Sequence, residues 1–258
     1  MIKKTDVTLA IVSYHNAADI YPAIKSIEKY TSTSIQKKIL IIDNANEPEV
    51  FRELVEQYPD VLYINPGENL GYARGNNYVL NHLDSRYHVI ANPDITFTED
   101  TLSKIIQYMD ETEGVGMVIP KILGEDGQIL PIYRKELTVF DLFVRRYSKN
   151  IFKRRIKRHT LSDQDYSKPF QVPFGQGSFL VIRTDLFRQL NGFDENFFLY
   201  VEDADFCKRV NRYSKLMYFP YTSVVHKWQR GSATDKNLLK AHVKSARYYF
   251  KKWGVKLI

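Results

Sequence analysis

The chain has 258 residues, 44% of them hydrophobic and 26% charged, which is typical of a folded globular protein and excludes extended disorder. Its single cysteine, Cys207, excludes a disulfide framework and falls in a helical pattern, which favours a core position over a reactive one. The net charge of +7 is concentrated in residues 145–158, where eight basic side chains occur without an acid; this favours an anionic surface as the partner and no nucleic acid.

Strand and helix patterns alternate through the first half of the chain. Runs rich in β-branched residues predict strands, and apolar residues at helical spacing predict helices between them. The strands are expected at residues 7–13, 38–42, 61–64, 87–91 and 115–119, and the helices at residues 19–30, 48–58, 71–80 and 99–110. Repeated strand–helix units predict an α/β protein with a mostly parallel central sheet and helices on both faces.

After residue 120 the pattern is less regular. An amphipathic basic stretch at residues 137–158 follows a turn, and an aromatic stretch at residues 191–201 is too poor in polar residues to be a free loop. The remaining strands are expected at residues 179–182, 217–219 and 224–226, and the remaining helices from residue 184, at residues 203–213 and at residues 238–253. No linker rich in proline, glycine or serine divides the chain, so we expect one domain with a helical appendage.

Two carboxylate clusters indicate the chemistry. Asp94 closes an Asn-Pro-Asp turn just past the expected strand at residues 87–91, where open α/β sheets bind their ligands, and it is well placed to hold a divalent cation. Glu202 and Asp203 follow the aromatic stretch, and carboxyl groups against aromatic surface tend to have raised pKa values that suit proton transfer near neutral pH. A metal cluster and a base cluster together predict a transferase or hydrolase that acts on a charged leaving group.

Six short segments, in order along nearly the whole chain, together form a recognisable pattern. Each segment alone would be weak evidence for a family. The segments are residues 11–16, 42–44, 69–77, 92–94, 192–205 and 224–226. In these segments the chain resembles the inverting glycosyltransferases of family 2, which have the GT-A fold, and particularly their bacterial rhamnosyltransferase-like branch. The resemblance implies a GT-A domain, a Rossmann-like nucleotide-sugar-binding half, an acceptor half with a basic amphipathic insert, and a C-terminal helix. The GT-A domain is expected at residues 1–230, with its nucleotide-sugar-binding half at 1–120 and its acceptor half at 121–230. The basic amphipathic insert is expected at residues 137–158 and the C-terminal helix at 231–258.

The resemblance also implies where the nucleotide sugar binds. The implied residues are Ser13, Tyr14, Asp43, Gly71, Arg74, Asn76, Asn92 and Asp94. Asp43, past the second strand, can accept hydrogen bonds from a base or ribose, and the alternative is a carboxylate that caps a helix or turn. Gly71 and Gly75 flank Arg74, where the backbone and a guanidinium could meet a phosphate, and the alternative is a plain helix start with a surface arginine.

In the resembling enzymes Asp94 corresponds to the last residue of an Asp-x-Asp metal motif, and His226 completes the coordination of Mg²⁺ or Mn²⁺. The first motif position here is Asn92, which removes one negative charge, although an amide oxygen can still bind a hard cation or the ribose. The alternatives are an ordinary proline turn and a structural histidine at a strand end.

In the resembling enzymes the base that takes the proton of the acceptor hydroxyl corresponds to Asp203, with Glu202 as its competitor. Asp205 is more consistent with a structural role or a pair with Arg209 at i,i+4. The alternative for all three acids is a helix N-terminus that favours negative charge. Tyr200 and Trp228 are candidates for stacking on a sugar, with core packing as the alternative.

The leading hypothesis is a hexosyltransferase that moves L-rhamnose from dTDP-L-rhamnose to a polyprenyl-linked or polymeric saccharide during cell-surface polysaccharide synthesis. Another donor, a UDP-hexose or galactofuranose, is the alternative, and a non-catalytic protein that binds anionic surfaces or a nucleotidyltransferase explains fewer residues. No apolar run approaches the roughly 18 residues that a membrane span needs, and the first residues lack a signal-peptide core. We therefore expect a cytoplasmic enzyme, peripheral at the inner face of the membrane, whose residues 145–158 bind the anionic surface or, alternatively, form a solvated face or a homodimer contact.

Overall fold

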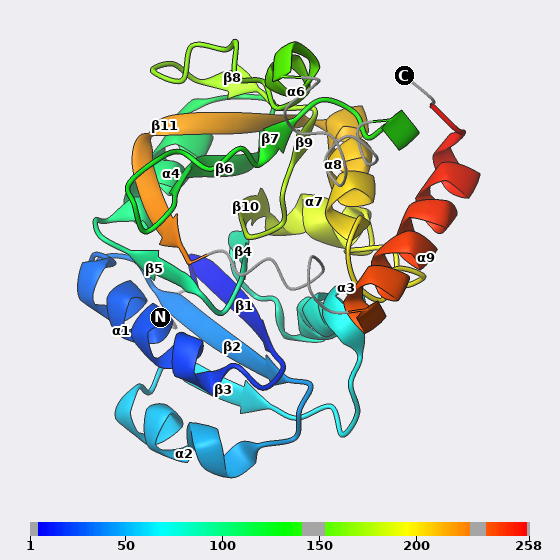
Figure 1. Cartoon of the computed structure of the whole chain (residues 1–258). Coiled ribbons are helices and arrows are strands. Elements are labelled where there is room, and N and C mark those ends of the chain that lie inside the picture. Colours follow the sequence, from blue (N-terminus) through cyan, green and yellow to red (C-terminus); the bar gives the residue numbers. More distant parts are fainter. Residues whose placement is uncertain (1–4, 141–152, 228–235, 257–258) are drawn as a thin grey trace.

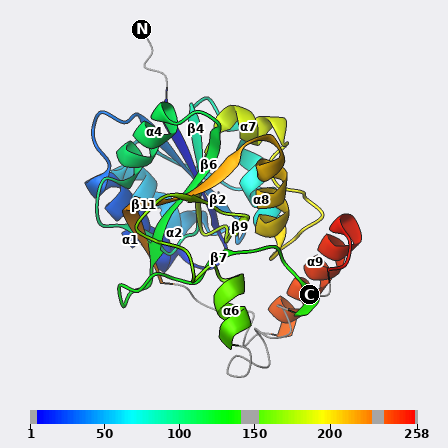
Figure 2. The same ribbon diagram turned by 90° about the horizontal axis from the view of Figure 1, so that it is seen from above.

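The computed structural model describes residues 5–140, 153–227 and 236–256, and its main feature is one large twisted sheet with helices on both sides (Figures 1 and 2). Four parallel strands form its first part, in the spatial order β3, β2, β1, β4. They are β1 (Val7–Ser13), β2 (Lys37–Asp43), β3 (Val61–Ile64) and β4 (Tyr87–Ala91). Every side chain of β1 and β4 is buried, as expected for parallel strands that are covered on both faces. The strands predicted in this half are confirmed.

Helices lie between strands of the sheet where the apolar spacing predicts them. They are α1 (Ala17–Tyr30), α2 (Pro48–Gln57), α3 (Gly71–Asn77) and α4 (Thr101–Glu111). Pro48 occupies the first turn of α2, where a missing N–H removes no hydrogen bond. The helix expected over residues 71–80 is shorter than predicted, because after α3 the chain tightens into a 3₁₀ turn at Tyr78–His82.

The second part of the sheet is mixed. Its strands are β5 (Ile95–Phe97), β6 (Val115–Leu123), β10 (Phe179–Arg183) and β11 (Lys215–His226). β10 lies antiparallel between β4 and β6, while β11 runs parallel to β6 and antiparallel to β5. The strand patterns expected separately at residues 217–219 and 224–226 belong to one strand, β11, whose register shifts between Phe219 and Ser223. Such an irregularity bends a strand, and here it carries the end of β11 to β5.

The bend closes the sheet toward its beginning. The backbone N–H of Phe97 in β5 donates to Ser26 Oγ of α1 at 2.9 Å, so the last strand of the order packs against the first helix. Three strands have only two residues: β8 (Phe170–Gln171) joins the sheet antiparallel to β11, while β7 (Tyr133–Arg134) and β9 (Phe174–Gly175) pair with each other in a small second sheet. They were not predicted, because two residues are too few to show a period.

Four described helices belong to the second half of the chain. These helices are α6 (Lys153–His159), α7 (Thr184–Gln189), α8 (Glu202–Tyr213) and α9 (Lys236–Trp253). α1 and α4 lie on one side of the sheet and α7 and α8 on the other, with α9 outermost beyond α8 (Figure 2). Of the helical insert expected over residues 137–158, α6 is the described end, and residues 141–152 lie outside the described residues. Among the described helices none combines the length and the apolar character needed to cross a bilayer.

Candidate active site

The Asn-Pro-Asp turn joins β4 to β5, and the pairing of β5 with β11 brings it to a histidine 132 residues further on. His226 at the end of β11 faces Ile95, so its Nε2 atom lies 3.2 Å from Asp94 Oδ1. The His226 side chain is 2% exposed and that of Asp94 is 11% exposed. The two residues that the resemblance assigns to the metal are therefore neighbours at the carboxyl end of the sheet.

A chain of hydrogen bonds links this turn to the second carboxylate cluster. Tyr72 Oη donates to the carbonyl of Gly177 at 2.6 Å and lies 3.2 Å from Asn92 Oδ1. The N–H of the same Gly177 donates to Asp203 Oδ2 at 3.1 Å. Burial raises the pKa of Tyr72 well above its ordinary value, and the charges of Glu202 and Asp203 add to the effect, so the hydroxyl keeps its proton. The Asn-Pro-Asp turn and the candidate base thus belong to one connected site.

The two candidate bases differ in their surroundings. Glu202 is 6% exposed and its Oε2 atom has no hydrogen-bond partner among the described residues. Burial raises the pKa of Glu202 well above its ordinary value, and the neighbouring Asp203 charge acts in the same direction. Asp203 is more open and accepts from the N–H groups of Gly177 and Ala204. Of the two, Glu202 has the environment of a neutral acid and Asp203 that of a carboxylate.

The backbone that presents this pair is strained. Tyr200 and Val201 both have a φ of 69°, a left-handed conformation that is rare for a β-branched residue such as Val201. Strain of this kind persists only where surrounding contacts hold it, and it gathers at functional sites. Here the turn directs α8 so that its first residues, Glu202 and Asp203, lie at the site.

The segment at residues 69–77 holds the loop before α8 in place. The N–H of Tyr72 donates to the carbonyl of Phe198 at 2.8 Å, and this approach requires Gly71, because a Cβ there would lie 2.7 Å from Phe198 Cδ2. Asn77 accepts from the N–H of Phe193 at 2.7 Å and donates to its carbonyl at 2.8 Å. Two of the resembling segments therefore lock together across 116 residues.

Several predicted nucleotide-binding residues use their polar atoms for hydrogen bonds within the protein. Asp43 is 1% exposed; its Oδ1 accepts from the N–H of Ala45 at 2.9 Å, and its Oδ2 accepts from Tyr63 Oη at 2.8 Å and the N–H of Glu47. The geometry matches the alternative of a turn carboxylate, and a donor contact by Asp43 stays a prediction. Ser13 is also fully buried and donates to Asn16 at 2.9 Å, whereas Tyr14 is 53% exposed.

The guanidinium group of Arg74, which we expect to bind a phosphate, lies near acidic side chains in the structure. Arg74 lies 3.5 Å from Glu68 and 4.0 Å from Glu195 on an exposed surface. Asn76 is 1% exposed and donates to the carbonyl of Tyr72 at 2.9 Å. Contacts of these two residues with a donor also stay predictions.

Asp205 has the structural role expected of it. It is fully buried and its pair with Arg209 at 2.8 Å is confirmed. Lys252 at 2.6 Å and Trp253 Nε1 at 2.9 Å, both from α9, also reach this carboxylate. Cys207 of the same helix is buried in the core, as predicted. α9 thereby anchors the helix that carries the candidate base.

Tyr200 is half-buried, with its ring centroid 5.1 Å from that of His242 in α9, and Trp228 lies outside the described residues. Sequence reasoning did not assign roles to Tyr72, Gly177 or Asn77. Tyr72 and Asn77 belong to the segment at residues 69–77, so the resemblance of this segment to the family was a signal that they could matter. Gly177 has no local signal, since its role depends on Asp203, 26 residues away.

The residues present fit a divalent cation. Asp94 offers a carboxylate oxygen and His226 an imidazole nitrogen, donors that suit Mn²⁺ and, for the carboxylate, Mg²⁺. No cluster of three or more potential metal-ligating residues occurs in the described part of the chain. Cations of this type complete their shells with phosphate oxygens and water, so two protein ligands suffice.

The sheet order, the strand-end site and the two linked carboxylate clusters are those expected of an α/β glycosyltransferase of the GT-A class. The family model for glycosyl transferase family 2 matches residues 8–190, and the chain belongs to this family. The resemblance seen in the sequence is thereby confirmed, as is the expectation of an enzyme.

Individual relatives agree with this assignment. The chain is 26% identical over 222 residues to N-acetylglucosaminyl-diphospho-decaprenol L-rhamnosyltransferase of Mycobacterium tuberculosis strain H37Rv, which covers 80% of this chain and 72% of that protein. It is 24% identical over 210 residues to rhamnosyltransferase WbbL of Escherichia coli K12, which covers 78% and 77%. The mannosyltransferase PcManGT from Pyrobaculum calidifontis, solved with GDP-Man and Mn²⁺, superposes with a TM-score of 0.62 at 17% identity, covering 89% of this chain and 59% of that one. This likeness confirms the GT-A fold.

Proposed function

We propose that the enzyme transfers a sugar with inversion from a nucleoside diphosphate to a saccharide that is carried on a polyprenyl diphosphate or a polymer. The supporting observation is the hydrogen-bonded path from Asn92 through Tyr72 and Gly177 to Asp203, with Asp94 and His226 at its other end. It joins groups suited to a diphosphate with a group suited to a hydroxyl. L-Rhamnose from dTDP-L-rhamnose is our first choice, because two similar proteins bear the name rhamnosyltransferase.

In this proposal Asp203 accepts the proton of the acceptor hydroxyl as that oxygen attacks the anomeric carbon. The N–H of Gly177 fixes the orientation of the carboxylate, and Tyr72 holds Gly177 through its carbonyl. Glu202, kept neutral by burial, leaves the negative charge of the pair on Asp203. Attack from the side of Asp203, opposite the departing diphosphate, inverts the anomeric configuration.

Asp94 and His226 would hold Mg²⁺ or Mn²⁺ in this proposal. When bound there, the cation would offset the negative charge of the leaving diphosphate. Asn92 adds no charge. Its Oδ1 atom lies 3.2 Å from Tyr72 Oη, so its Nδ2 group could donate to the ribose, while binding of the cation would use the Oδ1 atom. The similar mannosyltransferase was solved in complex with Mn²⁺, which supports the choice of metal.

A lipid-linked acceptor would be met at a membrane surface, and the mycobacterial relative is named for a decaprenyl-linked substrate. Binding of an anionic membrane by residues 145–158 stays a prediction; of that segment the structure describes α6, where Arg154, Lys157 and Arg158 are exposed.

The test is a donor panel with a short-chain prenyl-diphosphate GlcNAc acceptor. Purified enzyme would be given dTDP-L-rhamnose, UDP-hexoses, UDP-galactofuranose or GDP-mannose, with Mn²⁺, with Mg²⁺ or with a chelator, and product formation and its anomeric configuration would be measured. We expect transfer from a pyrimidine nucleotide sugar, inversion, and loss of turnover in chelator. Retention of configuration, or full turnover in chelator, would overturn the corresponding part of the proposal.

A further inference from the structure

The outer face of α9 has no role in the site. The inner face of the helix packs on the molecule through Ser245, Ala246 and Tyr249, which are buried. Its basic residues divide accordingly: Lys252 is turned inward and pairs with Asp194 and Asp205. The other five basic residues are exposed and lie on the outer face, namely Lys236, Lys240, Lys244, Arg247 and Lys251.

Among the residues that the structure describes, no acid pairs with the charges of this face. α9 contains no acidic residue, and among the described residues none of the five outward basic side chains forms an ion pair. By contrast, the neighbouring Lys208 and Lys256 both pair with Glu136. Five cations on one helix face form a local positive field that attracts a polyanionic surface.

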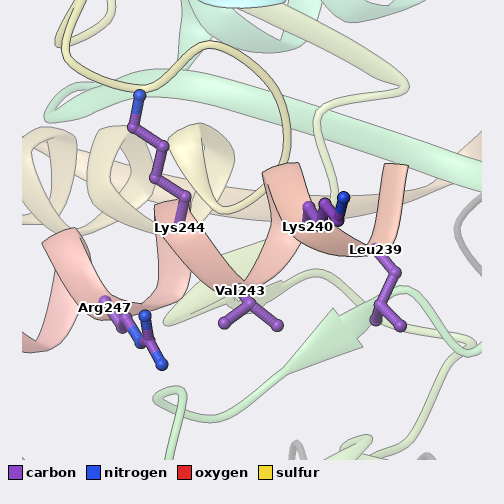
Figure 3. Close-up of a pocket in the computed structure, with 5 residues that line it drawn as sticks. All are labelled: Leu239, Lys240, Val243, Lys244 and Arg247. Atoms are coloured by element: carbon purple, nitrogen blue, oxygen red, sulfur yellow. The ribbon is translucent and has the colours of Figure 1, made fainter. Parts of the chain in front are cut away.

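Apolar side chains lie between these charges. Leu239, Val243 and Arg247 project from one side of the helix, next to Lys240 and Lys244, around an open hollow of about 530 Å³ (Figure 3). Val243 is 44% exposed although it is apolar. Leu239 beside it is half-buried. A cluster of Lys and Arg residues on one face of a helix is typical of surfaces that bind anionic headgroups, and aliphatic side chains among them can enter the interface.

The inner side of the same helix contacts the loop that precedes the candidate base. Ser245 Oγ donates to the carbonyl of Leu199 at 2.8 Å, and His242 packs on Tyr200. A bilayer in contact with the outer face would therefore lie about one helix diameter, roughly 10 Å, from this loop.

We propose that the outer face of α9 is a binding surface for anionic phospholipid bilayers. The proposal deepens the proposed function, since it identifies a surface at which a lipid-linked acceptor would be presented. Charge complementarity favours a bilayer, and the exposed Val243 with the half-buried Leu239 favours it over a purely ionic partner.

The test is sedimentation of the full chain with phosphatidylcholine vesicles that contain or lack phosphatidylglycerol. We expect binding only to the anionic vesicles, weakened by salt. Each basic residue at such a surface changes partitioning about fivefold, so replacing the five outer residues by Gln should lower it at least about a hundredfold if three or more touch the bilayer. A matched control replaces five exposed basic residues elsewhere by Gln: Lys25, Lys29, Arg52, Lys168 and Lys215.

Three results would overturn the proposal: no binding by the natural chain, equal loss in both five-residue variants, or loss only when Lys153, Arg154, Arg155, Lys157 and Arg158 are replaced. Tighter binding of duplex DNA than of anionic vesicles at the same salt concentration would identify a different partner. Circular dichroism and thermal unfolding check that each variant is folded. Turnover with a water-soluble acceptor, measured in parallel, separates failure of this proposal from failure of the proposed reaction, because vesicle binding requires no catalysis.

Discussion

Asp203 and Glu202 are adjacent in sequence, yet the structure gives them different chemical environments. We predict that Asp203→Asn lowers kcat by about 10²–10⁴ and leaves the KM for the donor nearly unchanged, because the amide keeps the shape and the hydrogen bond from Gly177 but cannot take a proton. Steady-state kinetics would show the split. If Glu202→Gln is inactive while Asp203→Asn turns over normally, the roles are reversed.

Glu202 also predicts a pH dependence of stability. Its pKa is raised in the folded enzyme by burial, so between about pH 4.5, the ordinary value for Glu, and the higher folded value the folded state holds a proton that the unfolded state has released. The free energy of unfolding must fall as pH rises through this window. Glu202→Gln, which resembles the neutral acid, removes the effect.

Urea unfolding of both proteins from pH 5 to pH 8 measures it. We expect Glu202→Gln to become progressively more stable than the natural enzyme as pH rises. Parallel stability curves would show that the Glu202 carboxyl is not held neutral.

Contacts between elements hold the candidate base in place. Substitutions at two glycines distinguish the loss of such a contact from the cost of a strained backbone alone. Gly67 and Gly71 have φ values of +80° and +72°, but a Cβ meets nothing within 4 Å at Gly67 and meets Phe198 at Gly71. Gly67→Ala should cost about 1 kcal/mol of stability through its left-handed backbone alone. Gly71→Ala should cost more and should also lower kcat, because it displaces the loop before α8.

Urea unfolding and kinetics of the two variants provide the comparison. Equal losses of stability with unchanged kcat would mean that the contact of Gly71 with Phe198 does not position the base.

The elements themselves were largely predictable. Strands such as Val7–Ser13 and Tyr87–Ala91 are short apolar runs between turn residues, and their short length and β-branched residues favour a strand over a buried helix. The direction of β10 was not predictable, since an apolar run reads the same whether its neighbours are parallel or antiparallel. The role of Asp43 was equally open, because a carboxylate after a strand can bind a ligand or its own loop, and only the positions of Tyr63 and Glu47 distinguish the two.

The whole molecule should respond to its ligands as one cooperative unit, since the site combines residues from both halves of the chain. A nucleoside diphosphate at a hundred times its Kd adds about 2.7 kcal/mol to the free energy of unfolding, which for a chain of this size raises Tm by roughly 5–10 °C. We expect this shift with dTDP or UDP plus Mn²⁺, and a smaller one in chelator or in Asp94→Asn. Differential scanning fluorimetry measures it. A shift unaffected by chelator would argue against a metal at Asp94.

The place of β10 in the sheet has a consequence for biosynthesis. β4 and β6 are completed by residue 123, but the strand that joins them is not made until residues 179–183. Until then both strands have an open edge of unpaired backbone N–H and C=O groups, which is a template for pairing with other chains. We therefore expect nascent chains that stall between these points to aggregate or to recruit chaperones, and the native sheet to form only after more than two thirds of the protein has left the ribosome.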